Sequence, residues 1–344
     1  MEPLRLPANQ PPKFYRGGPQ ITSFRSGAPD AGSAESTDGF APEDWIASTV
    51  ASDGTETDGA TRLPGGTLLR DAMSADPLAY LSPAQVAQFG ANPGLLVKLL
   101  DAGERLPVHC HPDRAFASAH LGCTFGKTEA WLIIGTEGPD PHVYLGFHRD
   151  VELPELESWF EEQDSDEILS AMHKVTVGVG DAILVPAGTP HAIGAGLFII
   201  ELQEPTDFSV MLEWKNFGLP ERHDSQLGMT VEQSLHCFNR HRMTADDIGA
   251  LQRRAAGPRE PGATTLLPPS ATPFFQAEEL VVDGSHDLEA AYSILIVLDG
   301  VGTLQTEGSS IDVGRGSTVL VPYSAGTATL RGQLRAIRCL PPPS

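Results

Sequence analysis

The segment VGVGDAILVP at 177–186 recurs 136 residues later as VGRGSTVLVP at 313–322, with six of ten residues identical. In each copy a glycine turn leads into a short apolar run that ends at proline, a pattern typical of a β-strand between two turns. An apolar strand also precedes each copy, AWLIIG at 130–135 and YSILIVLDG at 292–300. The repeat therefore predicts two tandem copies of one β-domain, each a barrel or jelly roll.

Composition and charge narrow the class of protein. The 344 residues include 35 glycines and 29 prolines, which favours short strands and turns over long helices. A formal net charge of -22 argues against nucleic acid or an anionic membrane as a partner. The start of the chain lacks an apolar leader, no apolar run is long enough for a membrane span, and the four cysteines form no CxxC pair. We expect a soluble, cytoplasmic protein with free thiols.

Two histidines and a carboxylate form the start of a candidate metal site. His109 and His111 lie two residues apart on an extended segment, so their side chains point to the same face. After a Gly-Lys-Thr turn, Lys127 and Glu129 share a face of the next strand, where a buried carboxylate is costly unless it is paired or bound to metal. His191 follows the first copy of the repeat. Three imidazoles and one carboxylate suit zinc, iron or manganese.

Simpler explanations exist for each of these residues. A single histidine is more often exposed, or buried in a core with its hydrogen bonds satisfied. An HxH pair alone is weak evidence for a metal site, but the agreement of three separated segments favours one. Lys127 either contacts a substrate or only pairs with Glu129. The repeat offers an internal comparison, because Thr327 stands 136 residues after His191 and no HxH precedes the second copy. We therefore expect the metal in the first copy only.

The predicted fold is mainly β, with two tandem domains and helices inserted around the first. We expect a metal-binding catalytic domain over 1–215 with a helical insertion at about 153–174. A helical segment and Pro-rich linker would fill 216–262, with the helix itself at 230–255. A C-terminal domain without metal ligands would then occupy 263–344.

At these same motifs the chain resembles the class I mannose-6-phosphate isomerases, which are zinc enzymes built from cupin domains. The stretches that carry the resemblance are LLVKLLDAGERLPVHCHPDR, GKTEAWLIIG and GDAILVPAGTPHAIGAGLFIIELQEPTD, together with the C-terminal copy. It covers most of the chain from about residue 94 and is faint before that. The resemblance implies two jelly-roll cupin domains and one Zn²⁺ per chain. It also implies a sugar phosphate partner, in a monomer or homodimer.

The resemblance also assigns roles to residues. His111, Glu129 and His191 correspond to zinc ligands, and Lys127 to the pocket lysine beside the metal. The family's remaining ligand is usually glutamine, and here that position is His109, which gives the three-His, one-Glu set of other cupins. The implied reaction interconverts mannose 6-phosphate and fructose 6-phosphate. It moves a proton between C1 and C2 through an enediol, with zinc as a Lewis acid and a base that the sequence does not identify.

One departure from the family keeps other functions open. Where the family carries an arginine after the last ligand strand, this chain has Met211. That change motivates an isomerase of a different, possibly unphosphorylated, sugar. A non-catalytic sugar-binding cupin and an iron oxygenase are further alternatives. Lys215 and Arg222 follow Met211 and are candidate phosphate contacts, although a solvated surface explains them equally well.

Overall fold

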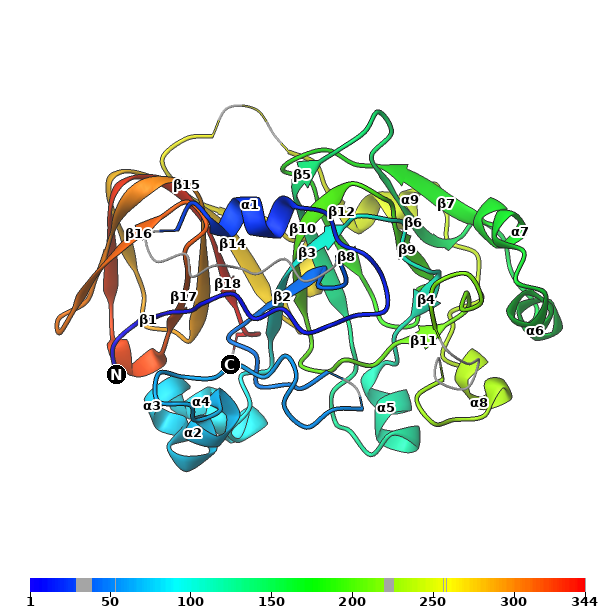
Figure 1. Ribbon diagram of the computed structural model, residues 1–344, viewed down its shortest axis with the longest axis horizontal. Helices are drawn as coiled ribbons and strands as arrows, with labels where there is room; N and C mark the ends of the chain where they lie inside the picture. Colours follow the sequence, from blue (N-terminus) through cyan, green and yellow to red (C-terminus); the bar gives the residue numbers. More distant parts are fainter. Residues whose placement is uncertain (29–38, 53, 220–225, 256, 258, 344) are drawn as a thin grey trace.

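The computed structural model describes residues 1–344 except 29–38, 53, 220–225, 256, 258 and 344. Three sheets, in which every paired strand is antiparallel, form its framework, and short helices surround them (Figure 1). The predicted mainly β fold with two tandem cupin units is confirmed.

Two facing sheets make up the first unit. The larger has the strand order β12-β8-β5-β10-β3-β2. Its bounds are Gln252–Arg253, Ala182–Val185, Glu129–Thr136, Leu197–Gln203, Leu96–Ala102 and Glu43–Ile46 in that order. The smaller has the order β11-β4-β9-β6-β7. Its bounds are Val210–Met211, His109–Cys110, His191–Ile193, His142–Phe147 and Met172–Thr176.

The C-terminal unit is built from long bent strands, drawn in orange and red in Figure 1. Its path is β1-β17-β15-β18-β14-β13, and β16 also pairs with β15. The bounds along this path are Leu4–Arg5, Thr318–Val321, Ser293–Gln305, Ala328–Leu340, Gln276–Leu288 and Gly262–Thr265, with β16 at Ser310–Gly314. The first strand of the chain thus pairs with β17 of the second copy. The predicted domain boundaries stay a prediction.

The sequence repeat corresponds to one backbone geometry formed twice. Gly180 and Gly316 occupy equivalent turns with φ of 93° and 85°, a conformation that favours glycine. The Gly180 N–H donates to the carbonyl of Ile133 at 2.8 Å, and the Gly316 N–H donates to that of Val297 at 2.9 Å. The strands that follow, β8 and β17, pair with β5 and β15 respectively. The two copies therefore share topology as well as sequence.

Helices are shorter and more broken than the sequence predicts. Residues 76–90 form two short helices, α3 (Pro77–Tyr80) and α4 (Pro83–Phe89), because Ser82 caps a new helix with Pro83 in its first turn. The insertion at 153–174 forms α6 (Leu153–Glu162) and α7 (Ser165–Ser170) and then enters β7. Gln163 in the left-handed conformation separates these two helices.

The single helix predicted over 230–255 is wrong. The chain forms α8 (Val231–Leu235) and α9 (Ala245–Ala250), each begun by its own capping threonine, and then β12. The remaining helices are α1 (Gln20–Arg25), α2 (Leu69–Ala75) and α5 (Arg114–His120), with 3-10 turns at Pro269–Ala271 and Tyr323–Ala325.

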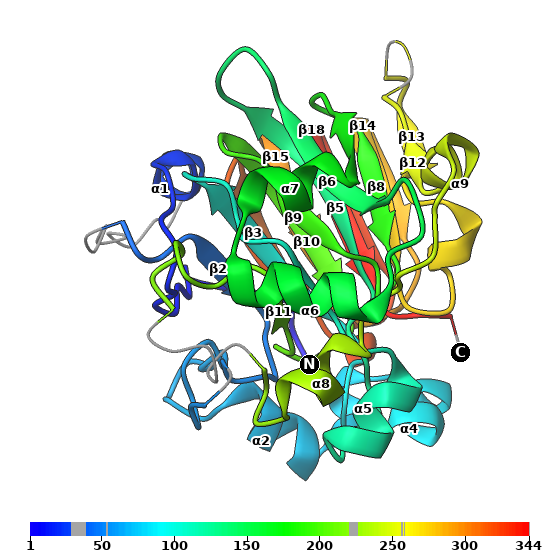
Figure 2. The same cartoon turned by 90° about the vertical axis from the view of Figure 1, so that its right-hand side faces the viewer.

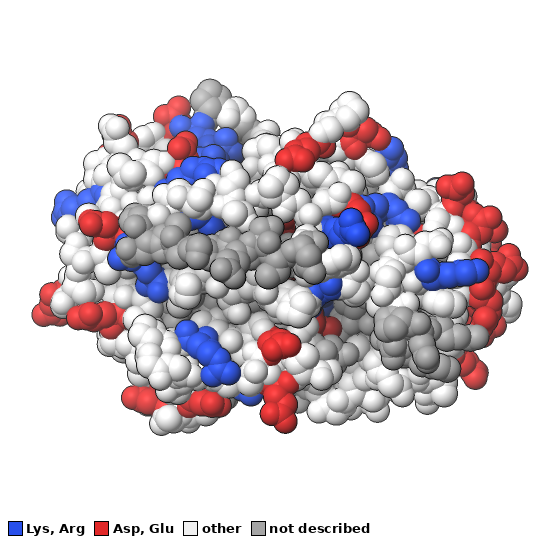
Figure 3. Space-filling model, viewed as in Figure 1, with Lys and Arg blue, Asp and Glu red and all other residues white. Residues whose placement is uncertain are grey.

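Figure 2 shows α6 and α7 on the outer face of the first unit. Acidic side chains gather over this edge of the molecule (Figure 3).

The two units share one hydrophobic core. Ile133 and Phe198 of the first unit belong to the same buried cluster as Phe275 and Ile337 of the second. Buried Arg25 of α1 adds a polar link, because its guanidinium donates to Gly316 and Thr318 on the C-terminal unit and to Leu6, while it pairs with Asp44 at 3.1 Å. Among the described residues, no helix has the length and apolarity that a membrane crossing requires.

We predict that Gly316→Ala destabilises the protein more than Gly326→Ala. Both glycines have positive φ, and holding an alanine in such a sparsely populated backbone conformation costs about 1–3 kcal/mol. A Cβ on Gly316 would also lie 2.2 Å from the carbonyl oxygen of Phe24, whereas one on Gly326 meets no atom within 4 Å among the described residues. Denaturant unfolding should give at least twice the loss for Gly316→Ala. Equal losses would contradict the packing of this repeat turn.

Candidate metal centre and cavity

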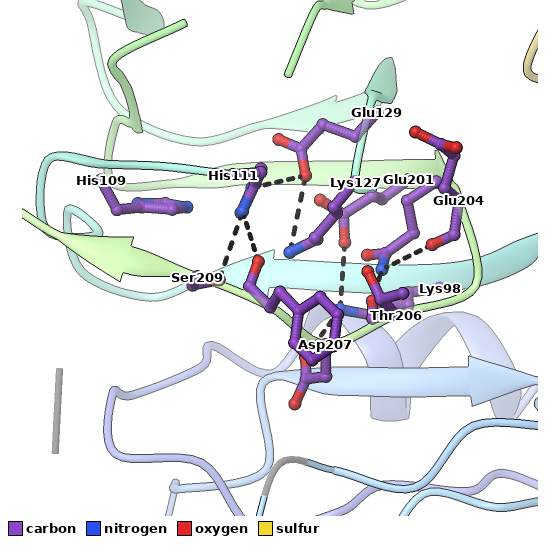
Figure 4. A network of polar contacts seen from close by, with 12 residues as sticks. Lys98, His109, His111, Lys127, Glu129, Glu201, Glu204, Thr206, Asp207 and Ser209 are labelled. Carbon is purple, nitrogen blue, oxygen red and sulfur yellow. Dashed lines mark hydrogen bonds and ion pairs between the residues drawn. The ribbon is translucent and has the colours of Figure 1, made fainter. Parts of the chain in front are cut away.

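Three imidazoles and one carboxylate meet at the centre of the first unit. Figure 4 shows three of these four residues, His109, His111 and Glu129. Nitrogen atoms of His109, His111 and His191 all lie within 4.8 Å of one another. Pairing of β4 with β9 sets His109 directly opposite His191, and β5 begins at Glu129. The Glu129 carboxylate lies 3.0 Å from His111 Nε2 and 3.3 Å from His191 Nε2. All four side chains are buried.

The hydrogen bonds of the imidazoles define their tautomers. Each Nδ1 lies 2.8 Å from a backbone carbonyl, those of Pro107, Phe208 and Thr189 for His109, His111 and His191. A carbonyl only accepts, so each Nδ1 carries the proton and each Nε2 of a neutral ring presents a lone pair. The Nε2 atoms of His109 and His191 are 3.0 Å apart. Lone pairs of three rings therefore face one another.

Burial keeps these rings neutral. It lowers the pKa of His109, His111 and His191 well below the ordinary value, and neighbouring imidazoles and Lys127 lower it further. Neither His111 Nε2 nor Glu129 Oε2 has a hydrogen-bond partner among the described residues. Four acceptor groups thus converge without a proton between them. This donor set fits a divalent cation, and the Nδ1–carbonyl bonds are the supports that metal-bound histidines ordinarily have.

Lys127 lies beside the carboxylate of this cluster. Its Nζ is 3.7 Å from Glu129 Oε2, and its side chain is almost fully buried. The turn that carries both residues is held by hydrogen bonds from the Lys127 N–H to Pro112 O and from Thr206 Oγ1 to Gly126 O. Lys127 also lines the cavity described next, so its ammonium group can reach a bound molecule as well as Glu129.

A cavity of about 270 Å³ opens beside the cluster. His109, Lys127 and Glu129 line it, as do Ser209 and Met211. Its other ionisable residues form a second buried network of opposite charges, shown in part in Figure 4: Lys13, Tyr15, Glu43, Lys98, Glu201 and Asp207. The three lysines and four carboxylates among the described lining residues leave one formal negative charge. A divalent cation reverses that sign.

The network centres on Lys98. Its Nζ lies 3.3 Å from Glu43, 3.4 Å from Glu201 and 3.8 Å from Asp207. Lys13 adds a second cation at 3.0 Å from Asp207. Burial, opposed by Lys98 and reinforced by Glu129, raises the pKa of Glu201 to about 7. A carboxyl group in a cavity with a pKa near neutrality is a candidate for proton transfer.

Sequence reasoning missed this network. Lys98 and Glu201 stand inside the apolar runs LLVKLL and LFIIELQ, where a lone charge is as costly as that of Glu129. The argument used for Glu129 therefore applied to both residues. β3 and β10 set them opposite each other. Glu43 and Asp207 carried no comparable signal.

The candidate substrate contacts differ in position. Lys215 is exposed and is not among the residues that line the cavity, while its backbone N–H donates to Gln163. Arg222 lies outside the described residues. Met211 lines the cavity, where β11 pairs it with His109 of β4. The position that prompted the alternative substrate is therefore part of the site.

The second copy has a serine where the first has Glu129. Glu129 pairs with Val185 of β8, and Ser293 pairs with the equivalent Val321 of β17. The hydroxyl of Ser293 accepts a hydrogen bond from Arg338. Among the described residues, the only group of three metal-ligating side chains is the histidine cluster of the first unit.

Comparisons with known proteins agree with this fold. Residues 265–341 match the family model described as "Mannose-6-phosphate isomerase, cupin domain". The mannose-6-phosphate isomerase of Streptococcus mutans is 29% identical over 245 residues, which cover 71% of this chain and 72% of the relative. That of Bacillus subtilis is 28% identical over 251 residues, covering 71% and 73%.

Solved structures extend the likeness to nearly the whole chain. The crystal structure of the Bacillus subtilis mannose 6-phosphate isomerase has a TM-score of 0.74 at 18% identity, covering 98% of this chain and 99% of that one. A mannose 6-phosphate isomerase bound with zinc and yttrium has a TM-score of 0.72 at 13% identity, covering 99% and 100%. At these identities the likeness shows the fold.

Fold and site together define a tandem cupin protein whose first unit gathers three histidines and one glutamate around a single point. The family model covers the C-terminal unit, and the relatives cover most of the chain. The C-terminal unit matches the mannose-6-phosphate isomerase cupin domain, and most of the chain is similar to mannose-6-phosphate isomerases, in line with its sequence motifs.

We predict that His109→Ala weakens zinc binding by at least the roughly 10–100-fold seen when a supporting residue of a metal site is lost. His109→Gln should keep the metal, because an amide oxygen can occupy the same position. Cys110→Ala is the control, since Cys110 faces away from the site into a separate hydrophobic cluster. Competition with a chelating dye measures the three affinities. Parent-like binding by His109→Ala would remove His109 from the ligand set.

Proposed function

We propose that this protein is a metal-dependent aldose–ketose isomerase that interconverts mannose 6-phosphate and fructose 6-phosphate in the cytoplasm. The metal is Zn²⁺, one per chain, held by His109, His111, Glu129 and His191. The observation that carries the proposal is the convergence of three neutral Nε2 lone pairs and a carboxylate beside a polar cavity. We take the reaction from the similar proteins, which are named mannose-6-phosphate isomerases.

The net charge of the residues that line the cavity indicates that an anionic substrate needs a bound metal ion. Without a cation, the described lining groups carry one excess negative charge in a chain whose net charge is -22. An anion would be repelled from such a site. With a divalent cation in place, the local charge becomes positive, and Lys13, Lys98 and Lys127 can then contact a phosphate or sugar oxygens.

Zinc, when bound, supplies Lewis-acid stabilisation of the negative charge that develops on oxygen during enediol formation. The chain's own residues do the remaining work. Lys127 holds a substrate oxygen next to that charge. Glu201 takes the proton from C2 and returns it at C1, because it lines the cavity and its pKa of about 7 lets it do both at neutral pH. Lys98 orients Glu201 across β3 and β10.

A second candidate function has support from Met211. This uncharged side chain lines the cavity and pairs across the strands with His109. An isomerase for an unphosphorylated sugar would need fewer cations there.

Under the first proposal, in which the substrate is a sugar phosphate, Arg222 and Lys215 stay proposed phosphate contacts.

A coupled isomerase assay over a panel of sugars, run with metal analysis, tests the function. Turnover of mannose 6-phosphate supports the first proposal. Turnover of free mannose alone supports the second. Sugar binding without turnover would leave a binding protein, and bound iron with oxygen uptake would indicate an oxygenase.

We predict that Glu201→Gln and Glu129→Gln fail in different ways. Glu201→Gln removes the proton-carrying group, so kcat should fall by about 10²-fold or more while zinc remains bound. Glu129→Gln removes a ligand, so zinc should be lost together with activity. Zinc content by elemental analysis separates the two variants. A Glu201→Gln enzyme with parental kcat would exclude Glu201 as the base.

We predict that Met211→Arg raises kcat/KM for mannose 6-phosphate. The guanidinium would add a positive charge to the cavity wall beside His109, where the substrate anion and the developing charge are stabilised. Met211→Leu keeps the volume without the charge and should leave the rate near that of the parent. An unchanged rate in a folded, zinc-loaded Met211→Arg enzyme would mean that this position does not limit phosphosugar turnover.

A further inference from the structure

Arg114 connects the turn at the metal site to the C-terminal unit. It is the first residue of α5, which begins three residues after His111. Its Nε donates to Glu204 Oε1 at 2.6 Å, and its side chain is 41% exposed. On the other side, the guanidinium carbon lies 5.1 Å from the ring centroid of Phe274. Phe274 is two residues before β14, one of the long strands of the C-terminal sheet.

The partner of Arg114 holds the turn that carries Lys127 and Glu129. Glu204 is 1% exposed, and its Oε2 accepts the backbone N–H of Thr128 at 2.9 Å. The Glu204 N–H also donates to the Thr128 carbonyl at 3.1 Å. Thr128 stands between Lys127 and Glu129, so the Glu204 carboxylate holds the backbone between them.

We propose that Arg114 is a positioning residue through which the C-terminal cupin unit fixes the Lys127–Glu129 turn. The contacts of Arg114 with the described residues do not include the proposed ligands; it acts on them through Glu204 and Thr128. Stacking on Phe274 restricts the rotamers of Arg114 and so keeps the buried carboxylate of Glu204 aimed at the Thr128 N–H. The second copy, which has no ligand cluster among its described residues, thereby acts on the metal site.

The effect should be graded, because the turn has other supports. The Lys127 N–H and the Gly126 carbonyl keep their own hydrogen bonds when Arg114 is absent. We expect Arg114→Ala to weaken zinc binding about 10-fold, at the lower end of what supporting residues of metal sites contribute. Phe274→Leu should weaken it roughly two- to five-fold, since it removes the ring face and keeps apolar bulk. Arg114→Lys should lie between the parent and Arg114→Ala.

Arg149 provides a matched control. It also pairs with a glutamate, Glu155, at 2.6 Å and lies over a tryptophan ring, Trp159, at 5.6 Å, and it is 44% exposed. Arg149→Ala therefore removes the same kinds of contact from α6, away from the metal site. It should leave zinc affinity and kcat/KM unchanged.

The decisive measurement is a double-mutant cycle on zinc affinity in the full-length protein. If Phe274 acts on the metal site through Arg114, as proposed, Arg114→Ala with Phe274→Leu should bind zinc no more weakly than Arg114→Ala alone. Full additivity, or an Arg114→Ala protein that binds zinc as tightly as Arg149→Ala, would overturn the proposal. Arg114→Lys keeps the test open if Arg114→Ala does not fold. The turnover readout, a lower kcat with little change in KM, rests on the proposed isomerase function; zinc affinity does not, so failure of either proposal is recognised separately.

Discussion

The first unit depends on holding four acceptor groups at one point in a buried place. Two imidazole nitrogens only 3.0 Å apart, both with lone pairs, repel each other unless a cation lies between them. Strand pairing supplies the rigidity, because β4, β9 and β5 each carry a member of the cluster. Three backbone carbonyls fix the ring orientations. The repulsive arrangement is thus built into the sheets, and a bound cation would relieve it.

The sequence predicts those features of the fold and site that depend on neighbouring residues, and it does not predict contacts between distant segments. Alternation along an extended strand is local, so the sequence predicts that His109 and His111 share a face. The turn of the repeat singles out His191, and the structure brings all three histidines together. Helix boundaries over 230–255 were not predictable from apolar spacing, since capping threonines at 230 and 244 begin separate short helices. Contacts between distant segments, such as those of Lys13 and Asp207, have no local signal at all.

A shared core explains why the chain keeps a second copy without ligands. Residues of both units pack in one hydrophobic cluster, and the first strand of the chain belongs to the C-terminal sheet. Neither unit therefore buries all of its apolar residues without the other. The second unit also contacts, through Phe274, the helix that follows His109 and His111. The second unit therefore stabilises the shared core and also contacts the surroundings of the histidine cluster.

The register of the two copies shows why the second is unsuited to hold a cation. In the first copy one row across the sheet reads Ile183, Trp131, Glu201 and Lys98. The equivalent row of the second reads Val319, Leu295, Arg338 and Glu278. The ion pair is kept, at 3.4 Å and 3.2 Å, but its polarity is reversed. A buried guanidinium, always charged, then lies beside Ser293 where the first copy has Glu129, and it would repel a metal ion from that position. Loss of the carboxylate and gain of the arginine act in the same direction, so restoring a glutamate at 293 alone would form an ion pair with Arg338 rather than a metal site.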